Sequence, residues 1–182
     1  PVAVEKRRDY GHWEGDTVKG RMGSKTSLIT LTERKSREEI IIKVEQATQE
    51  AIQAAFDGLE RKYGQAFRGK FKSITFDNGV EFLDWRRLEI SLAGKGRRTT
   101  IYFAHSYSSW ERGTNENHNR MIRRFIPKGM DIADLSEAEI KAIEDWMNDY
   151  PRKNLAYKTP KQVAAECWQS SNFDRTFKFC RN

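Results

Sequence analysis

The sequence predicts a single α/β domain in which helices flank a mixed five-stranded sheet. The elements follow one another in the order β-β-β-α-β-α-β-α, and further helices trail them. Three strand-like segments joined by short polar links come first, which is typical of an antiparallel meander. Two later strands alternate with helical segments, and such connections add parallel strands with helices on both faces. The 182 residues, 37% of them hydrophobic, are enough to bury a core.

Five segments are rich in β-branched and aromatic residues and are predicted to be strands: His12–Lys19, Ser27–Glu33, Glu38–Val44, Lys72–Asp77 and Thr99–Ala104. Links containing Gly20, Gly23 and Ser36 separate the first three. The turn pair Asn78-Gly79 ends the fourth strand. The spacing therefore places the meander at the start of the chain.

Helices are predicted from apolar periodicity and from start and stop signals, at about 48–63, 80–92 and 114–125, from 136 to about 149, and from 160 onward. Gly64 ends the first, and Ser136 with Glu139 forms a capping box. Pro160 suits the first position of a helix. In the third helix, we expect Met121, Ile122 and Phe125 to pack on the sheet.

Charge and composition limit the classes of partner. The formal net charge is +7 and the sequence pI is near 9.4, which favours a polyanionic partner. Two cysteines, Cys167 and Cys180, are too few for a disulfide framework or a cysteine-rich zinc site. No apolar run reaches the roughly 20 residues of a membrane span, and no secretion signal is visible. We therefore expect a cytosolic protein without a membrane partner.

The chain begins with proline, so we expect it to be a fragment or a processed product with sequence missing upstream. Residues 1–10 are polar and are predicted to be a lead-in segment. Residues 11–168 are predicted to form the domain, and 169–182 a C-terminal tail.

Three acidic residues can converge in the predicted fold. Asp16 lies in the first strand, Asp77 ends the fourth, and Glu116 lies in the helix that should pack on the sheet. Carboxylates of this kind are hard oxygen ligands suited to Mg²⁺ or Mn²⁺. Two such ions would activate a water or a 3′-hydroxyl in phosphoryl transfer. The chain holds 26 acids, so this spacing alone is a weak signal.

At these residues the sequence resembles the catalytic domain of the insertion sequence thirty family of bacterial transposases. The resembling stretches are GHWEGDTV (11–18), LTERKSRE (31–38), TFDNGVEF (75–82), SSWERGTNENHNRMIRRFIPKG (108–129) and YPRKNLAYKTPKQV (150–163). They occur in the family's order, and the region from the first stretch to the last, 11–163, covers about 85% of the chain. This family belongs to the Asp-Asp-Glu transposases and retroviral-type integrases, so the resemblance implies an RNase H-like fold.

The resemblance implies catalytic and metal-binding roles for Asp16, Asp77 and Glu116, with Mg²⁺ or Mn²⁺, in two copies, as the cofactor. It implies cleavage at transposon ends and transfer of the 3′-hydroxyl into target DNA, inside the bacterial cytoplasm. The partner would be double-stranded DNA, and the active complex a homo-oligomer. In this family a helix-turn-helix region normally precedes the domain, and we expect that region to be missing from this chain. Arg120 departs from the family, which has glycine there, and the 38 residues between Asp77 and Glu116 are a few more than typical.

Several residues near Glu116 are predicted to contact DNA: Arg112, Asn115, Asn119, Arg120, Arg123 and Arg124. Basic residues farther away are predicted as outer contacts: Arg97, Arg98, Lys153 and Lys158.

Other residues and functions stay open at this point. Glu14 shares a strand face with Asp16 and is either a ligand or the partner of a nearby arginine. Glu81 is a ligand or a solvated acid at a helix start, and His118 is a supporting donor or, more typically, an exposed helix histidine. The alternative functions are an RNase H-like nuclease that cleaves RNA–DNA hybrids and a DNA-binding or assembly module without catalysis.

Overall fold

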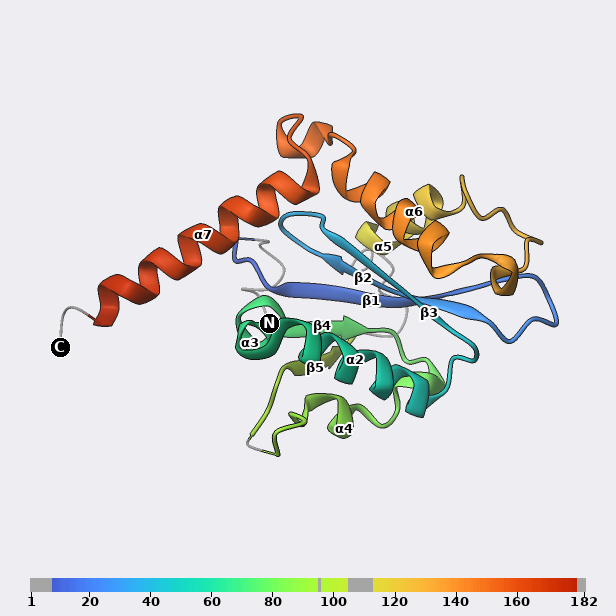
Figure 1. The fold of residues 1–182 in the computed structure, drawn as a ribbon, viewed down its shortest axis with the longest axis horizontal. Coiled ribbons are helices and arrows are strands. Elements are labelled where there is room, and N and C mark those ends of the chain that lie inside the picture. Colours follow the sequence, from blue (N-terminus) through green and yellow to red (C-terminus); the bar gives the residue numbers. More distant parts are fainter. Residues whose placement is uncertain (1–7, 95, 105–112, 180–182) are drawn as a thin grey trace.

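The sheet holds five strands in the order β3-β2-β1-β4-β5, with helices on both faces (Figure 1). This computed structural model describes residues 8–94, 96–104 and 113–179, and for 113–116 and 171–179 it describes the backbone alone. The strands are β1 (His12–Lys19), β2 (Ser27–Glu33), β3 (Glu39–Val44), β4 (Ser73–Phe76) and β5 (Thr100–Phe103). Each matches a predicted strand to within one residue at either end.

The meander and the crossovers are confirmed. Strand β1 pairs antiparallel with β2, and β2 with β3. Strand β4 lies parallel to both β1 and β5, so the sheet is mixed. Because side chains alternate along a strand, β1, β2 and β3 contribute to two separate cores, whereas the core residues of β4 and β5 belong to the first.

The first core lies under α2 (Gln49–Tyr63), α3 (Phe67–Lys70) and α4 (Trp85–Glu89). It includes Trp13 and Phe76, both fully buried. The second core lies under α5 (Gly113–Ile122) and α6 (Glu137–Asp149), and it includes Val18 from β1. Figure 1 shows the two groups of helices on opposite sides of the sheet. Neighbouring residues of β1 therefore face different layers.

Local signals place the helix starts. The side chain of Thr48 accepts a hydrogen bond from the amide of Ala51 at the start of α2. Ser136 and Glu139 form the predicted capping box of α6. The last helix, α7 (Pro160–Phe179), begins at the predicted proline. It projects away from the body of the molecule in Figure 1, and it runs through the predicted boundary between residues 168 and 169.

Two predicted helices are shorter than expected. The helix predicted at 80–92 is a 3-10 turn (Val80–Phe82) followed by α4, because Asp84 between them has a non-helical backbone. The break lets Phe82 stack on Phe76, with ring centroids 4.0 Å apart. Helix α5 ends at Ile122, so Phe125 lies beyond it, 40% exposed, with its ring edge-on to Trp146. The expectation that Phe125 packs on the sheet was wrong.

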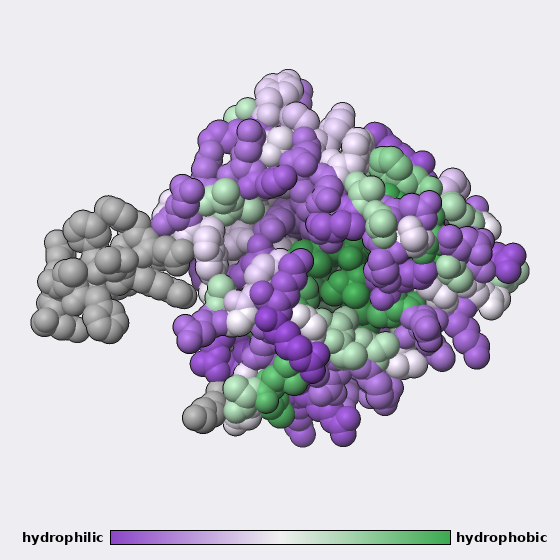
Figure 2. Space-filling model, in the orientation of Figure 1, coloured by the Kyte–Doolittle hydropathy of each residue, from purple (hydrophilic) through white to green (hydrophobic). Residues whose placement is uncertain are grey.

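Side chains of α6 occupy the free edge of the sheet at β3. Asn148 accepts a hydrogen bond from the backbone N–H of Glu39 and donates one to its carbonyl, both 2.8 Å long. Glu144 accepts from the N–H of Ile41. An unpaired strand edge is a template for pairing with another chain, and these contacts satisfy its polar groups. Figure 2 shows hydrophobic residues gathered in the middle of this face, between the helices of the two layers.

Candidate active site

The strand register brings Asp16 and Asp77 to the same place on the sheet. Strands β1 and β4 are parallel, with Glu14 opposite Thr75. Two residues farther along each strand the chain reaches Asp16 and, just past the end of β4, Asp77. The period of two puts both on the face that carries α5, opposite the face of Trp13 and the first core. Two of the three predicted acids therefore come at corresponding positions of adjacent strands, on the same face of the sheet.

Helix α5 lies over Asp16. Asn119 of this helix donates a hydrogen bond of 2.7 Å to Oδ2 of Asp16, and the backbone N–H of Thr17 donates to Oδ1. Met121 and Ile122 are buried in the second core and hold the helix against the sheet. The carboxylate of Asp16 is thus oriented by one strand donor and one helix donor.

Glu116 lies in α5, three residues before Asn119, so its backbone is almost one helical turn from the residue that contacts Asp16. The side chains of Glu116 and Asn115 lie outside the described residues, and so does Arg112 as a whole. Within the described part of the chain, no group of three or more His, Cys, Asp or Glu side chains could hold a metal ion. The position of the third acid is therefore known at the level of its helix.

Gly79, two residues after Asp77, makes room for two carboxylates. A Cβ atom at Gly79 would lie 3.0 Å from Oδ1 of Asp77 and 2.7 Å from Oε2 of Glu81. Both oxygens therefore point into the space that a side chain would fill, and both side chains are partly buried. Oδ1 of Asp77 also accepts a hydrogen bond of 3.1 Å from the backbone N–H of Gly79, which orients this carboxylate. Carboxylate oxygens are ligands that suit a hard divalent cation. Glu81 is therefore a partly buried side chain beside Gly79, not the fully solvated acid that one of the two alternatives describes.

Glu14 is buried on the same face, two residues before Asp16, and it pairs with an arginine. Its Oε1 lies 3.3 Å from Nε of Arg34, and the Glu14 side chain is 0% exposed. Of the two alternatives, the partner of a nearby arginine is the one that the structure shows. A buried carboxylate needs such a cation, since a lone charge is expensive to desolvate.

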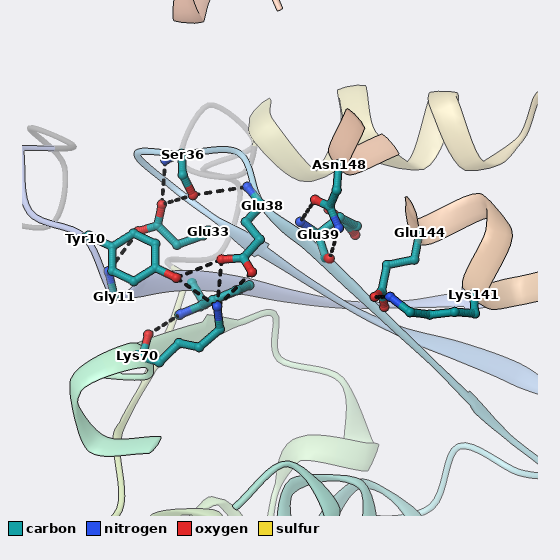
Figure 3. A network of polar contacts seen from close by, with 11 residues as sticks. Tyr10, Gly11, Glu33, Ser36, Glu38, Glu39, Lys70, Lys141, Glu144 and Asn148 are labelled. Carbon is teal, nitrogen blue, oxygen red and sulfur yellow. Dashed lines mark hydrogen bonds and ion pairs between the residues drawn. The ribbon is translucent and has the colours of Figure 1, made fainter. Parts of the chain in front are cut away.

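The turn that carries Arg34 is built around Glu33 (Figure 3). The carboxylate of Glu33 accepts hydrogen bonds from the backbone of Gly11, Lys35 and Ser36 and from the hydroxyl of Ser36. Burial raises the pKa of Glu33, and the donors of Ser36 and Gly11 oppose this rise. These bonds fix the end of the β2–β3 hairpin and so the place of Arg34.

A second cluster closes the other side of this hairpin. Lys70 of α3 binds both carboxylate oxygens of Glu38, at 2.7 and 2.8 Å, and Tyr10 donates to the same carboxylate (Figure 3). Burial, followed by the charge of Glu38, raises the pKa of Tyr10 far above its ordinary value. Lys70 is therefore engaged within the protein, although it belongs to a basic stretch of the sequence.

The expectation that His118 is exposed was wrong, because this residue is buried and only 3% exposed. Its Nδ1 lies 2.6 Å from Oε2 of Glu39, which also accepts a hydrogen bond from Thr32. Glu39 begins β3, far from α5 in the sequence, so no local pattern indicates this contact. The sequence signal that was available is the position of His118, three residues before the buried Met121.

Two further ionisable groups near this face have shifted pKa values. Burial, followed by the charge of Lys72, lowers the pKa of His12, whose Nδ1 lies 2.7 Å from the hydroxyl of Ser73. Burial also lowers the pKa of Arg152, and the charge of Glu39 opposes that effect. The guanidinium of Arg152 contacts the sulfur of Met121 and donates to the carbonyl of Met147, so it joins α5 to α6.

The arginines predicted to contact DNA differ in whether their side chains are exposed or already bound within the protein. Arg120 and Arg124 are exposed on and just after α5. Arg123 donates to the carbonyl of Lys19 at 2.8 Å, so its guanidinium is already bound to the sheet.

Among the predicted outer contacts, Arg98 is wrong. It is 2% exposed and forms ion pairs with Asp57 and Glu60 in the first layer of helices. Arg97 pairs with Glu89, and Lys158 pairs with Glu166, while both stay largely exposed. Lys153 is exposed.

Comparison with known proteins gives sequence relatives over most of the chain. The transposase for insertion sequence element IS1086 of Cupriavidus metallidurans is 37% identical over 166 residues, 91% of this chain. Transposase InsI for element IS30A of Escherichia coli is 35% identical over 160 residues, 88% of this chain. The homologues of this chain are therefore transposases of the IS30 family. The chain spans 46% and 39% of the length of these two relatives. No family model matches it.

Solved structures of integrases share the fold of this chain. The catalytic core domain of the BIV integrase superposes with a TM-score of 0.62 and 17% identity, and covers 89% of this chain and 98% of that one. A simian T-cell lymphotropic virus intasome gives the same TM-score at 15% identity, with 86% and 54% covered. The predicted RNase H-like fold is thus confirmed. No helix in the described residues is long and apolar enough to cross a membrane.

Proposed function

We propose that this chain is the catalytic core of an IS30-type transposase, which cleaves DNA strands at transposon ends and joins the exposed 3′-hydroxyl to target DNA. Asp16, Asp77 and Glu116 are the proposed metal ligands, with Mg²⁺ or Mn²⁺ as the cofactor. The observation that carries the proposal is the register of β1 and β4, which sets Asp16 beside Asp77 under the helix that contains Glu116. The named relatives support the reaction class.

The reaction consists of two phosphoryl transfers without a covalent enzyme intermediate. In the first, water attacks the phosphorus at the transposon end, and the bond to the 3′-oxygen breaks to leave a 3′-hydroxyl and a 5′-phosphate. In the second, that hydroxyl attacks a phosphodiester of the target and releases a target 3′-hydroxyl. When bound, divalent ions supply nucleophile activation and stabilise the leaving oxygen.

The chain's own residues supply the positions and the charge. Asp16 offers its carboxylate in an orientation fixed by Asn119 and Thr17, so little freedom is lost when a ligand binds. Arg120 and Arg124 are exposed beside this helix and can neutralise phosphates of the DNA backbone. Such contacts hold the duplex without reading its sequence. The partner proposed for this surface is double-stranded DNA, and a homo-oligomer is proposed for the active complex.

The experiment uses this chain with Mn²⁺ on three labelled substrates: end-sequence DNA, random DNA and an RNA–DNA hybrid. We expect metal-dependent nicking and strand joining on DNA. Cleavage confined to the hybrid would favour the RNase H-like nuclease, and binding with no cleavage of any substrate would favour the assembly module.

The variants Asp16→Asn, Asp77→Asn and Glu116→Gln should each abolish cleavage and leave DNA binding equal or slightly tighter. Each removes one ligand and one negative charge that faces the phosphates. Glu137→Gln, an exposed acid at the start of α6, is the matched control and should keep full activity. Robust nicking by any of the three site variants would remove that residue from the proposed triad.

A further inference from the structure

Helix α5 is attached to the sheet by two polar contacts at successive residues. Asn119 donates to Asp16 of β1, and His118 contacts Glu39 of β3. These two strands lie on either side of β2, so the contacts are separated across the sheet. Two anchors on different strands define the rotation of a helix about its own axis, which one contact cannot do.

Glu39 is held through one carboxylate oxygen, Oε2, and through its backbone. Its carboxylate accepts from Thr32 at 2.7 Å, and its backbone N–H and carbonyl are both bound by Asn148 of α6 (Figure 3). The Glu39 side chain is 0% exposed and that of His118 is 4% exposed. A buried hydrogen bond between fixed partners is costly to leave unmade. Glu39 is therefore a rigid point against which α5 can be set.

From these contacts we propose that His118 is a positioning residue of the active site. Its hydrogen bond to Glu39 sets the rotation of α5 and so the direction in which Glu116, two residues earlier, is presented to Asp16 and Asp77. Successive residues of an α-helix lie about 100° apart around its axis. A change in the rotation of α5 would therefore move a metal ligand on this helix away from the other ligands. This inference rests on the proposed function, because it concerns the third ligand of that site.

The substitutions separate the hydrogen bond from the bulk of the side chain. A carboxylate accepts, so Nδ1 of His118 is the donor. His118→Asn carries an N–H donor on Cγ, the same place as Nδ1, whereas His118→Gln carries it one atom farther out. His118→Leu fills the space without a donor. Ser136→Ala removes the cap of α6 and serves as the control for a general loss of stability.

The measurement is a titration with Mn²⁺ in the absence of DNA, in which the EPR signal of the free ion reports the affinity. Residues that orient metal ligands typically change metal affinity by about 10–100-fold. We expect His118→Leu and His118→Gln to weaken Mn²⁺ binding at least about tenfold, and His118→Asn to stay within about threefold of the wild type. Ser136→Ala should lower Tm and leave the affinity unchanged. On DNA, kcat should fall with KM unchanged.

The decisive comparison is a double-mutant cycle with Glu116→Gln. If His118 acts through Glu116, His118→Leu should cause no further loss of Mn²⁺ affinity in the Glu116→Gln background. An equal loss in both backgrounds, or wild-type affinity in His118→Leu and His118→Gln, would overturn the inference. Should His118→Leu fail to fold, the contrast between His118→Gln and His118→Asn decides the question. Unchanged Mn²⁺ binding in Glu116→Gln alone would instead refute the proposed triad.

Discussion

Gly15 lies in β1, one residue before Asp16, and we predict that Gly15→Ala destabilises the protein. A Cβ at this position would lie 2.1 Å from Cε1 and 2.5 Å from Cδ1 of Phe76. Carbon atoms in contact are normally about 3.5–4.0 Å apart, so one of the two groups must move by more than about 1 Å. Phe76 cannot move freely, because its ring stacks on Phe82 at 4.0 Å and packs against Phe56 at 6.1 Å.

Overpacking of a dense core costs about 1–3 kcal/mol, and the pinned ring places Gly15→Ala at about 3 kcal/mol. For a chain of this size that is a decrease in Tm of about 6–12 °C. Urea unfolding and thermal melts followed by circular dichroism measure both values. Gly58→Ala is the matched control: it lies in α2 with nothing within 4 Å of the added Cβ, so it should stabilise by about 0.5–1 kcal/mol.

The cause is tested by repeating Gly15→Ala in a Phe76→Leu background, where the clashing ring atoms are gone. There the cost should fall below about 1 kcal/mol, a coupling of about 2 kcal/mol between neighbouring residues. If Gly15→Ala is within about 0.5 kcal/mol of the wild type, or if the two changes are additive, the steric argument is refuted.

Three further predictions concern charge. Arg34→Met should cost about 3–5 kcal/mol in urea unfolding, because it breaks the buried ion pair between Arg34 and Glu14. A loss below about 1 kcal/mol would contradict this. The pKa of His12 is lowered in the folded state, so the unfolded chain takes up a proton at this residue first as the pH falls through about 6.5. The Tm of the wild type should therefore fall more than the Tm of His12→Gln between about pH 7.5 and 5.5. Equal decreases in the two proteins would contradict this prediction. Replacing the exposed Arg120 and Arg124 by alanine should flatten the log–log salt dependence of DNA binding by about 1.8, whereas Arg123→Ala should change it less; an unchanged slope in the double variant would place the DNA elsewhere.

Local pattern predicted the parts of the fold that depend on local physics. The strands around Asp16 and Asp77 have the composition of buried strands, and the cap at Ser136 is a local hydrogen-bond motif. The helix at 80–92 was predicted too long because its apolar period hides a break at Asp84. At that break Phe82 stacks on Phe76, which is a tertiary contact. Periodicity cannot show which of two compatible backbones a distant ring will favour.

The supporting contacts of the site could not be predicted in the same way. His118 and Glu39 are 79 residues apart, and Asn148 and Glu39 are 109 apart. A histidine on a polar helix is ordinarily exposed, and nothing near His118 in the sequence marks a carboxylate waiting on another strand. Arg98 was misplaced for the same reason, since its partners Asp57 and Glu60 belong to α2, about 40 residues earlier in the chain. Charge in a sequence shows neither burial nor partners.

The alternation of side chains along β1 ties the stability of this fold to the geometry of the proposed site. Trp13 and Gly15 face the first core, where Gly15 receives the ring of Phe76 and so fixes how closely β4 lies beside β1. Asp16 and Asp77 each follow one of these core residues directly and face the opposite layer. A change that shifts Phe76 therefore also shifts Asp77, although no atom of the polar face is altered. Gly15→Ala should accordingly weaken Mn²⁺ binding as well as stability, and a variant that melts earlier with unchanged Mn²⁺ affinity would show that the two faces are independent.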